Sequence, residues 1–210
     1  HKAAKKTSAL VNQICLDPLM KSTYPFDDLP FLKKINKYMA PGDDAKLGYD
    51  LDFIGIQPYT REVVKYAFYI PYIQAMRVNP VKRQVPTTAM GWEFYPKTIY
   101  RTLKWLNRYN QLPPIYITEN GVALDDKMTN GAINDVERIT YLRQSLQYLR
   151  QAKAEGSPVK GYFLWTLTDN FEWAEGYGPR FGIVHVDFNT LKRTVKASGK
   201  WFKQLLHDEE

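Results

Sequence analysis

Apolar positions along this chain recur with the period of a helix in some segments and of a strand in others, and these switches predict the order of elements. The opening run KAAKKTSALVNQI predicts a helix. Residues 51–56, LDFIGI, are β-branched and aromatic and predict a strand, and an irregular stretch with five prolines follows them. From Thr98, the sequence TIYRTLKWLNRY places Ile99, Leu103 and Leu106 on one face of a second helix.

The alternation continues in the second half of the chain. The run IYIT from Ile115 predicts a strand. A long helix follows, in which Asn134 and Glu137 have the spacing of a capping box and Gly156 supplies the stop. Its apolar positions are Ile139, Leu142, Leu146 and Leu149.

The last two predicted elements complete an α/β pattern. VKGYFLWTL from Val159 is almost continuously apolar, which predicts a strand buried on both faces. A final helix is expected from about Thr194, with an apolar side formed by Trp201, Phe202, Leu205 and Leu206. A helix followed by three strand–helix units predicts an α/β fold of parallel strands with crossover helices. Three predicted strand ends, GIQPYT, ITENG and LWTLTDNFEW, carry polar and aromatic groups, and functional side chains of α/β barrels gather at such ends.

Composition and charge change this picture little. The net charge is +7, but the basic residues are spread along the chain. The run KGYFLW carries Phe163 where an RNA-binding motif needs a small residue, so no nucleic-acid partner is expected. Aromatic residues make up 14% of the chain, and Tyr and Trp serve equally well in a core or as sugar-stacking surfaces.

The single cysteine and the lengths of the apolar runs narrow the class of protein further. Cys15 is the only cysteine and lies in an apolar stretch, so it is expected to be buried and no internal disulfide exists. No apolar run is long enough to cross a bilayer, so no membrane partner is expected and a soluble, cytoplasmic location is favoured. Asp125 and Asp126, on a turn expected to be exposed, make no metal site, and no metal or cofactor is expected. The helical pattern begins at once after His1, which predicts further sequence upstream.

Four motifs together resemble a known family. ITENG, LWTLTDNFEWAEGYGPRFGIVHVDF, DFIGIQPYT and MGWEFYP are similar to the C-terminal half of family-one glycoside hydrolases, the β-glucosidase family, and the similarity covers nearly the whole chain. The resemblance implies the C-terminal part of a (β/α)8 TIM barrel, about strands 6 to 8 with their helices, which is not a closed barrel by itself. Residues 1–210 are then a single partial domain.

The resemblance also implies roles for individual residues. Glu119 corresponds to the nucleophile of a retaining β-glycosidase and Tyr59 to the tyrosine that orients it. The residues that correspond to the sugar-binding site are Trp165, Glu172, Trp173 and Phe181. Without the motifs, Glu119 is an ordinary carboxylate at a strand end, and Trp165 and Phe181 suit core packing almost as well. Glu172 would repel a phosphate, so the implied substrate is an unphosphorylated β-glucoside or related β-glycoside.

The chain departs from the family pattern in two places. Gln57 and Pro58 stand where the family has Asn-Tyr, which leaves the local backbone course open. Trp92 and Glu93 resemble a family stretch that is either structural or at the rim of the aglycone site. No Asn-Glu-Pro, the motif of the family's acid/base glutamate, occurs in the 210 residues.

Two hypotheses follow from this missing motif. The first is a segment of a β-glucosidase-type enzyme, completed by an N-terminal half of the barrel in the same or a separate chain. The second is a catalytically inactive, truncated or split fragment that acts at most as a carbohydrate-binding or interaction module. In either case the isolated chain is expected to be inactive, because one carboxyl group of a pair gives no acid catalysis.

Overall fold

The computed structural model describes residues 1–208, which form two compact units. The first, unit 1, comprises His1–Asp52 and Glu62–Arg83, and the second, unit 2, comprises Phe53–Arg61 and the chain from Gln84 onward. Within the described residues, no helix is both long enough and apolar enough to cross a membrane.

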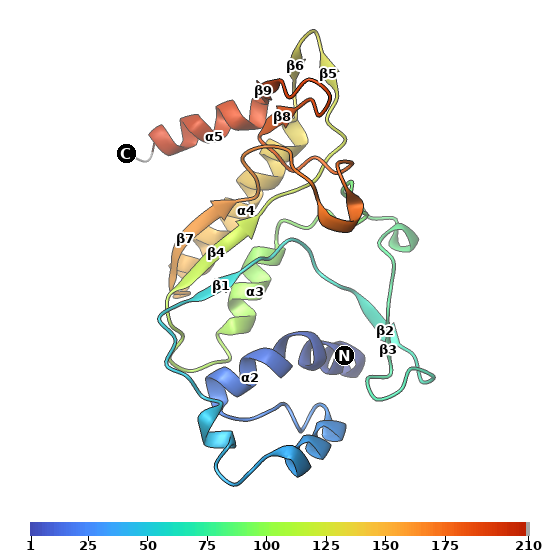
Figure 1. The fold of residues 1–210 in the computed structure, drawn as a ribbon, viewed down its shortest axis with the longest axis vertical. Helices are drawn as coiled ribbons and strands as arrows, with labels where there is room; N and C mark the ends of the chain where they lie inside the picture. The colour runs from blue at the N-terminus through green and yellow to red at the C-terminus, as the bar shows by residue number, and fades with distance from the viewer. Residues whose placement is uncertain (209–210) are drawn as a thin grey trace. The chain divides into compact units, whose positions relative to one another are not determined.

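Unit 2 is built on a three-stranded parallel sheet (Figure 1). Its strands are β1 (Ile54–Ile56), β4 (Ile115–Asn120) and β7 (Val159–Leu164), in the order β1-β4-β7. Ile54 pairs with Ile115, and Ile115 pairs with Val159, so the three strands start level. The predicted parallel strands are therefore confirmed, and their carboxyl ends meet at one edge of the sheet.

Crossover helices connect these strands as the sequence predicts. Helix α3 (Thr98–Leu106) leads into β4, and α4 (Val136–Ala154) leads from β4 to β7. The two helices pack against each other, with Ile99, Leu103 and Leu106 of α3 fully buried. Their spacing of four and three residues puts all three on one helical face.

The start of α4 differs from the prediction. The N-cap residue is Asp135 rather than Asn134, and no side chain caps the first turn, so the predicted capping box with Glu137 is wrong. The Asp135 carboxylate instead accepts hydrogen bonds from the backbone N–H of Ser198, at 2.8 Å, and from the Ser198 hydroxyl. A long-range contact has displaced the local motif.

The C-terminal segment also starts its helix later than expected. Thr194 lies in β9 (Arg193–Val195), which pairs antiparallel with β8 (Val184–Val186), and α5 spans Ala197–His207. A second small hairpin, β5 (Met128–Thr129) with β6 (Ala132–Ile133), lies between β4 and α4. These short hairpins are too brief for their periodicity to show in the sequence.

Strand β7 is not buried on both faces, contrary to prediction. Phe163 within it is 58% exposed, and Leu167 beyond its end is 67% exposed. β7 is an outer strand of the sheet, so among the described residues of unit 2 one of its edges has no partner strand. Its continuous apolar character is what a strand covered on both faces requires, and such a cover is lacking in unit 2.

Unit 1 contains helices and one hairpin. The predicted first helix is present as α1 (Lys2–Ser8), a π-helical turn (Ala9–Gln13) and α2 (Ile14–Lys21). 3-10 helices span Pro30–Tyr38, Asp44–Lys46 and Val81–Arg83, and the proline-rich stretch contains the unpredicted hairpin of β2 (Val64–Tyr66) and β3 (Ala75–Arg77).

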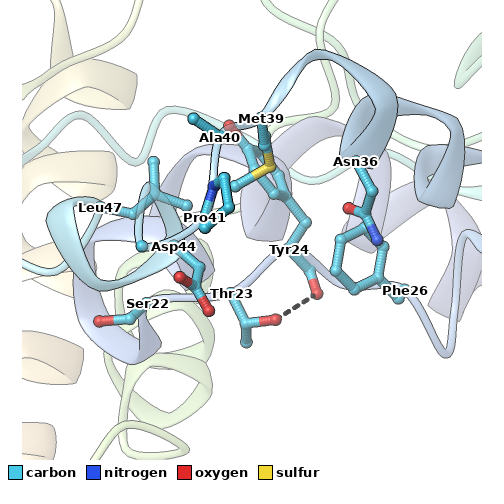
Figure 2. A pocket seen from close by; sticks show the side chains of 11 residues that line it. Ser22, Thr23, Tyr24, Phe26, Asn36, Met39, Ala40, Pro41, Asp44 and Leu47 are labelled. Atoms are coloured by element: carbon cyan, nitrogen blue, oxygen red, sulfur yellow. Dashed lines mark hydrogen bonds between the residues drawn. The ribbon is translucent and has the colours of Figure 1, made fainter.

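The exposure of Cys15 and the lining of one cavity in unit 1 can be compared with the sequence predictions. Cys15 is exposed rather than buried, because it falls on the outer face of its helix. A cavity of about 450 Å³ is lined by apolar side chains such as Tyr24, Met39 and Leu47 together with Asn36 and Asp44 (Figure 2). None of the predicted site residues lines this cavity.

Candidate active site

The carboxylate of Glu119 and the hydroxyl of Tyr59 form the centre of the candidate site. Glu119 is half-buried near the end of β4, and Tyr59 lies three residues after β1. The Tyr59 hydroxyl donates a hydrogen bond of 2.8 Å to Oε2 of Glu119. Burial, and then the bond to Glu119, raise the pKa of the Tyr59 phenol well above its ordinary value. The phenol therefore stays protonated and keeps donating to the carboxylate.

Donors from the neighbouring strand set the backbone that carries Tyr59. Residues 57–60 belong to no strand. The Thr118 hydroxyl donates to the carbonyl of Ile56, at 3.3 Å, and Nδ2 of Asn120 donates to the carbonyl of Pro58, at 2.7 Å. Carbonyl groups near a buried site need such partners when no sheet supplies them. The departure at Gln57 and Pro58 is thus accommodated by side chains of β4.

Gly121 allows the third strand to approach the candidate nucleophile. A Cβ atom at Gly121 would lie 1.8 Å from the carbonyl oxygen of Trp165, so no other residue fits without movement of the backbone. The backbone N–H of Trp165 also donates to the carbonyl of Asn120, at 3.0 Å. A residue without a side chain is therefore required at position 121, because the chain after β7 occupies the space where a Cβ atom would stand.

Two predicted sugar-binding residues contact each other. Nε1 of Trp165 donates to Oε1 of Glu172 at 3.2 Å. The Glu172 carboxylate also contributes to the raised pKa of Tyr59, after burial and Glu119. Glu172 thus belongs to the same electrostatic environment as Glu119. Trp173, the next residue, is 84% exposed and has a positive φ of 48°.

An aromatic cluster lies beside the tyrosine. The ring of Tyr59 lies 6.0 Å from Phe181 in an edge-to-face arrangement and 5.5 Å from Trp92. Phe181 is 2% exposed, and its ring is 6.3 Å from Trp92. Such pairs stabilise the ring orientations that they connect. Phe181 therefore holds the ring of Tyr59 by packing.

The buried Glu93 carboxylate forms an ion pair with Arg61. Its carboxylate is 5% exposed and accepts two hydrogen bonds from Arg61, from Nε at 3.0 Å and from Nη2 at 2.9 Å. The Arg61 guanidinium also lies over the ring of Tyr95, 4.0 Å from its centroid. Bidentate geometry gives this pair a definite orientation, and it supports a structural role for Glu93.

A buried group of charged side chains was missed by sequence reasoning. This ionic cluster comprises Asp126, Asp135, Arg138, Asp169, Arg180 and Lys196. Arg138 donates to both oxygens of Asp126, at 3.1 and 3.0 Å, and also contacts Asp135. Nζ of Lys196 contacts Asp126 and lies 2.8 Å from Oδ1 of Asp169. The exposed turn expected for Asp126 is wrong, since its side chain is 1% exposed.

The ionic cluster ties the chain after β4 to the chain after β7. The Asp169 carboxylate accepts from the backbone N–H of Gly182 at 2.9 Å, and Nη2 of Arg138 donates to the carbonyl of Arg180 at 2.7 Å. Both bonds flank Phe181. The sequence gives no local signal for this cluster, because partners of opposite charge, such as Asp126 and Lys196, lie far apart along the chain. Within the described residues, no group of three or more His, Cys, Asp or Glu side chains has an arrangement that could hold a metal ion.

Comparison with known proteins gives the family. The family model of glycosyl hydrolase family 1 matches residues 1–210. The chain belongs to glycosyl hydrolase family 1. It is 42% identical over 192 residues to a 1,4-beta-D-glucan glucohydrolase of Thermotoga neapolitana, with 91% of this chain and 42% of that protein covered. It is 40% identical over 209 residues to beta-glucosidase A of Acetivibrio thermocellus, covering 97% of this chain and 46% of that protein.

Solved structures of the family establish the fold. A Thermotoga maritima family 1 glycoside hydrolase, in complex with a cyclophellitol analogue, matches with a TM-score of 0.86 and 39% identity, over 98% of this chain and 46% of that one. The family 1 beta-glucosidase from Exiguobacterium antarcticum matches with a TM-score of 0.87 and 35% identity. This family 1 chain spans less than half the length of these relatives. Its fold is part of a TIM barrel that its three parallel strands do not close.

Proposed function

We propose that this chain is the C-terminal segment of a retaining β-glycosidase that removes terminal, non-reducing β-D-glucosyl residues, with Glu119 as the nucleophile. The hydrogen bond from Tyr59 to Glu119 is the observation that carries the proposal. A nucleophilic carboxylate has to be ionised and held in one rotamer, and a donated hydrogen bond from a protonated phenol favours both. Residues 1–210 act in this proposal as one partial domain.

The reaction needs a second carboxyl group from sequence outside these 210 residues. In the first step, a Glu119 oxygen bonds to the anomeric carbon as the bond from that carbon to the aglycone oxygen breaks, and the second carboxyl group gives its proton to that oxygen. In the second step, a water oxygen attacks the anomeric carbon, the water's proton returns to the second carboxylate, and Glu119 is released. "Completed protein" here means residues 1–210 together with the polypeptide that supplies this group.

The sugar itself is held, in this proposal, by Glu172 and the rings around it. A carboxylate can accept hydrogen bonds from two neighbouring hydroxyl groups, while an indole offers an N–H group and a flat apolar face. The contact between Trp165 and Glu172 supports this assignment, because it orients the carboxylate. Trp173 and Phe181 complete the proposed subsite. A phosphorylated sugar is disfavoured by the charge of Glu172.

Trapping of the glycosyl-enzyme tests the proposal. The completed protein is incubated with a 2-deoxy-2-fluoro-β-glucoside that has a good leaving group, digested and analysed by mass spectrometry. A 2-fluoroglucosyl adduct on Glu119 is the expected result. An adduct on another residue, or steady hydrolysis of an aryl β-glucoside with no adduct on Glu119, contradicts the assignment.

A second function has one observation in its favour. Trp173 is 84% exposed, and exposed indole rings are good platforms for sugars, so a catalytically silent carbohydrate-binding or interaction module is the alternative. The two functions differ in a simple assay. If no polypeptide supplies the second carboxyl group, residues 1–210 bind a β-glucoside without turning it over, and Trp173→Ala abolishes that binding.

A further inference from the structure

The segment that presents Tyr59 is held from the side of helix α4 as well as from β4. The hydroxyl of Tyr141, on α4, donates a 2.8 Å hydrogen bond to the backbone carbonyl of Tyr59, 82 positions earlier in the sequence. This bond is in addition to the one from Asn120 to the carbonyl of Pro58. Two successive carbonyls of an irregular segment therefore each have a fixed donor.

Tyr141 is itself rigidly placed. Its side chain is 1% exposed and packs with Val122 and Leu142, and its ring meets Phe94 edge to face at 5.2 Å. Burial raises the pKa of Tyr141 to about 12, so its hydroxyl keeps its proton and remains a donor at any pH at which a glycosidase works. Because the buried ring has one favoured position, the Tyr141 hydroxyl holds the Tyr59 backbone at a fixed place relative to α4.

Asn120 connects this donor to the other strands. Its side chain is fully buried, and Nδ2 lies 3.5 Å from the Tyr141 hydroxyl and 2.7 Å from the Pro58 carbonyl. Its Oδ1 accepts a 3.0 Å hydrogen bond from the hydroxyl of Tyr162 on β7. Asn120 directly follows Glu119, so the same network fixes both the carboxylate-bearing strand and the segment that carries its hydrogen-bond donor.

We propose that Tyr141 is a positioning residue for the reaction: its hydroxyl holds the Tyr59 backbone so that the Tyr59 hydroxyl meets Glu119. The proposal rests on the function proposed above for Glu119. Tyr141 touches neither the carboxylate nor the proposed sugar subsite, so it acts on the attack step only through Tyr59. A displacement of a donor by about 1 Å is enough to cost roughly 100-fold in rate.

The test compares four forms of the completed protein: wild type, Tyr141→Phe, Tyr59→Phe and the double variant. Each is inactivated with a 2-deoxy-2-fluoro-β-glucoside, which gives a first-order rate constant for attack by the nucleophile and a separate binding constant. Tyr141→Phe is expected to lower the rate constant about 10- to 100-fold and to leave the binding constant unchanged. In the Tyr59→Phe background, Tyr141→Phe is expected to have no further effect.

Tyr148→Phe is the matched control, since Tyr148 lies on the same helix but contacts Tyr100 and Lys97 instead of the site. It is expected to behave as wild type. An unchanged rate constant in Tyr141→Phe overturns the inference, as does a full additional loss in the double variant or an equal change in binding. If wild type is not labelled on Glu119, the proposed function fails and the inference falls with it. If only the variant effects are missing, the inference alone fails.

Discussion

The Tyr59 hydroxyl donates to the Glu119 carboxylate at 2.8 Å, across 60 positions of sequence. Tyr59 follows β1 and Glu119 is the second-last residue of β4, so the bond joins the carboxyl ends of two adjacent parallel strands. The sequence neighbours of Tyr59 and Glu119 do not determine that these two side chains meet. Their contact is the feature of this chain that supports Glu119 as a nucleophile.

A small anion should restore the activity that is lost when the Glu119 carboxylate is removed. In the completed protein, Glu119→Ala is expected to lose nearly all hydrolysis of an aryl β-glucoside, because no group attacks the anomeric carbon. Added azide fills the vacated space and attacks from the same face, so activity returns and the product is the α-glucosyl azide. Asp125→Ala, at an exposed acidic residue close in sequence, serves as control. Formation of β-glucosyl azide would show that Glu119 is not the nucleophile.

Buried tyrosines should make the protein lose stability at high pH. Burial raises the pKa of Tyr141 to about 12, whereas in an unfolded chain the phenol ionises near about 10. Below about pH 10 both states keep the proton and the contribution is constant. Between about 10 and 12 only the unfolded state loses it, so the free energy of unfolding falls by about 1.4 kcal/mol per pH unit for this group.

Urea unfolding of the completed protein between about pH 9 and 11, a range that brackets the ordinary phenol pKa, checks this slope. Tyr141→Phe should show a shallower fall than wild type, because it lacks the group that titrates differently in the two states. Equal slopes for the two proteins would mean that Tyr141 contributes nothing to the alkaline loss.

Gly121→Ala should disturb the candidate site without changing any polar group. The added methyl would lie 1.8 Å from the Trp165 carbonyl oxygen, so the backbone of one strand end has to move. We expect a loss of stability of about 1–3 kcal/mol and a rate lowered more than sugar binding, because Glu119 is two residues away. Gly131→Ala, at a hairpin turn with open space around the added atom, tests overall tolerance but carries backbone strain from its positive φ. A Gly121→Ala variant with wild-type stability and rate would contradict the close approach.

The ionic cluster should be sensitive to the loss of a single charge. Lys196→Met leaves Asp126 and Asp169 buried without their ammonium partner, and breaking a buried pair in this way costs about 3–5 kcal/mol. The free energy of unfolding of the completed protein is the quantity to measure. Lys200→Met, at an exposed lysine of α5, should change it by less than about 0.5 kcal/mol. Similar values for the two variants would rule out a structural role for the cluster.

Residues 1–210 produced alone should behave as an incomplete barrel. Phe163 and Leu167 are exposed, and β7 has an unpaired edge within unit 2. Such surfaces bind hydrophobic dyes and associate. We expect dye binding, concentration-dependent association on gel filtration and no hydrolysis of an aryl β-glucoside. Phe163→Lys should reduce the association. A monodisperse chain that hydrolyses the substrate would contradict both the missing half and the need for a second carboxyl group.

Much of this arrangement is predictable from sequence because it depends on neighbours along the chain. Periodicity predicts β1, α3, β4, α4 and β7 in their order, since the spacing of apolar residues records which face of an element is buried. The ordered motifs around Glu119 predict the family that comparison then confirms.

The tertiary structure alone decides the rest. The Asp135 carboxylate bonds to Ser198 and leaves the first turn of α4 without a side-chain cap, and Asp126 is buried because Arg138 and Lys196 neutralise it. The periodicity of α4 gives no role to Tyr141, yet its hydroxyl holds the Tyr59 backbone. These contacts join positions tens of residues apart, and a local pattern holds no information about which distant donor will satisfy a buried acceptor.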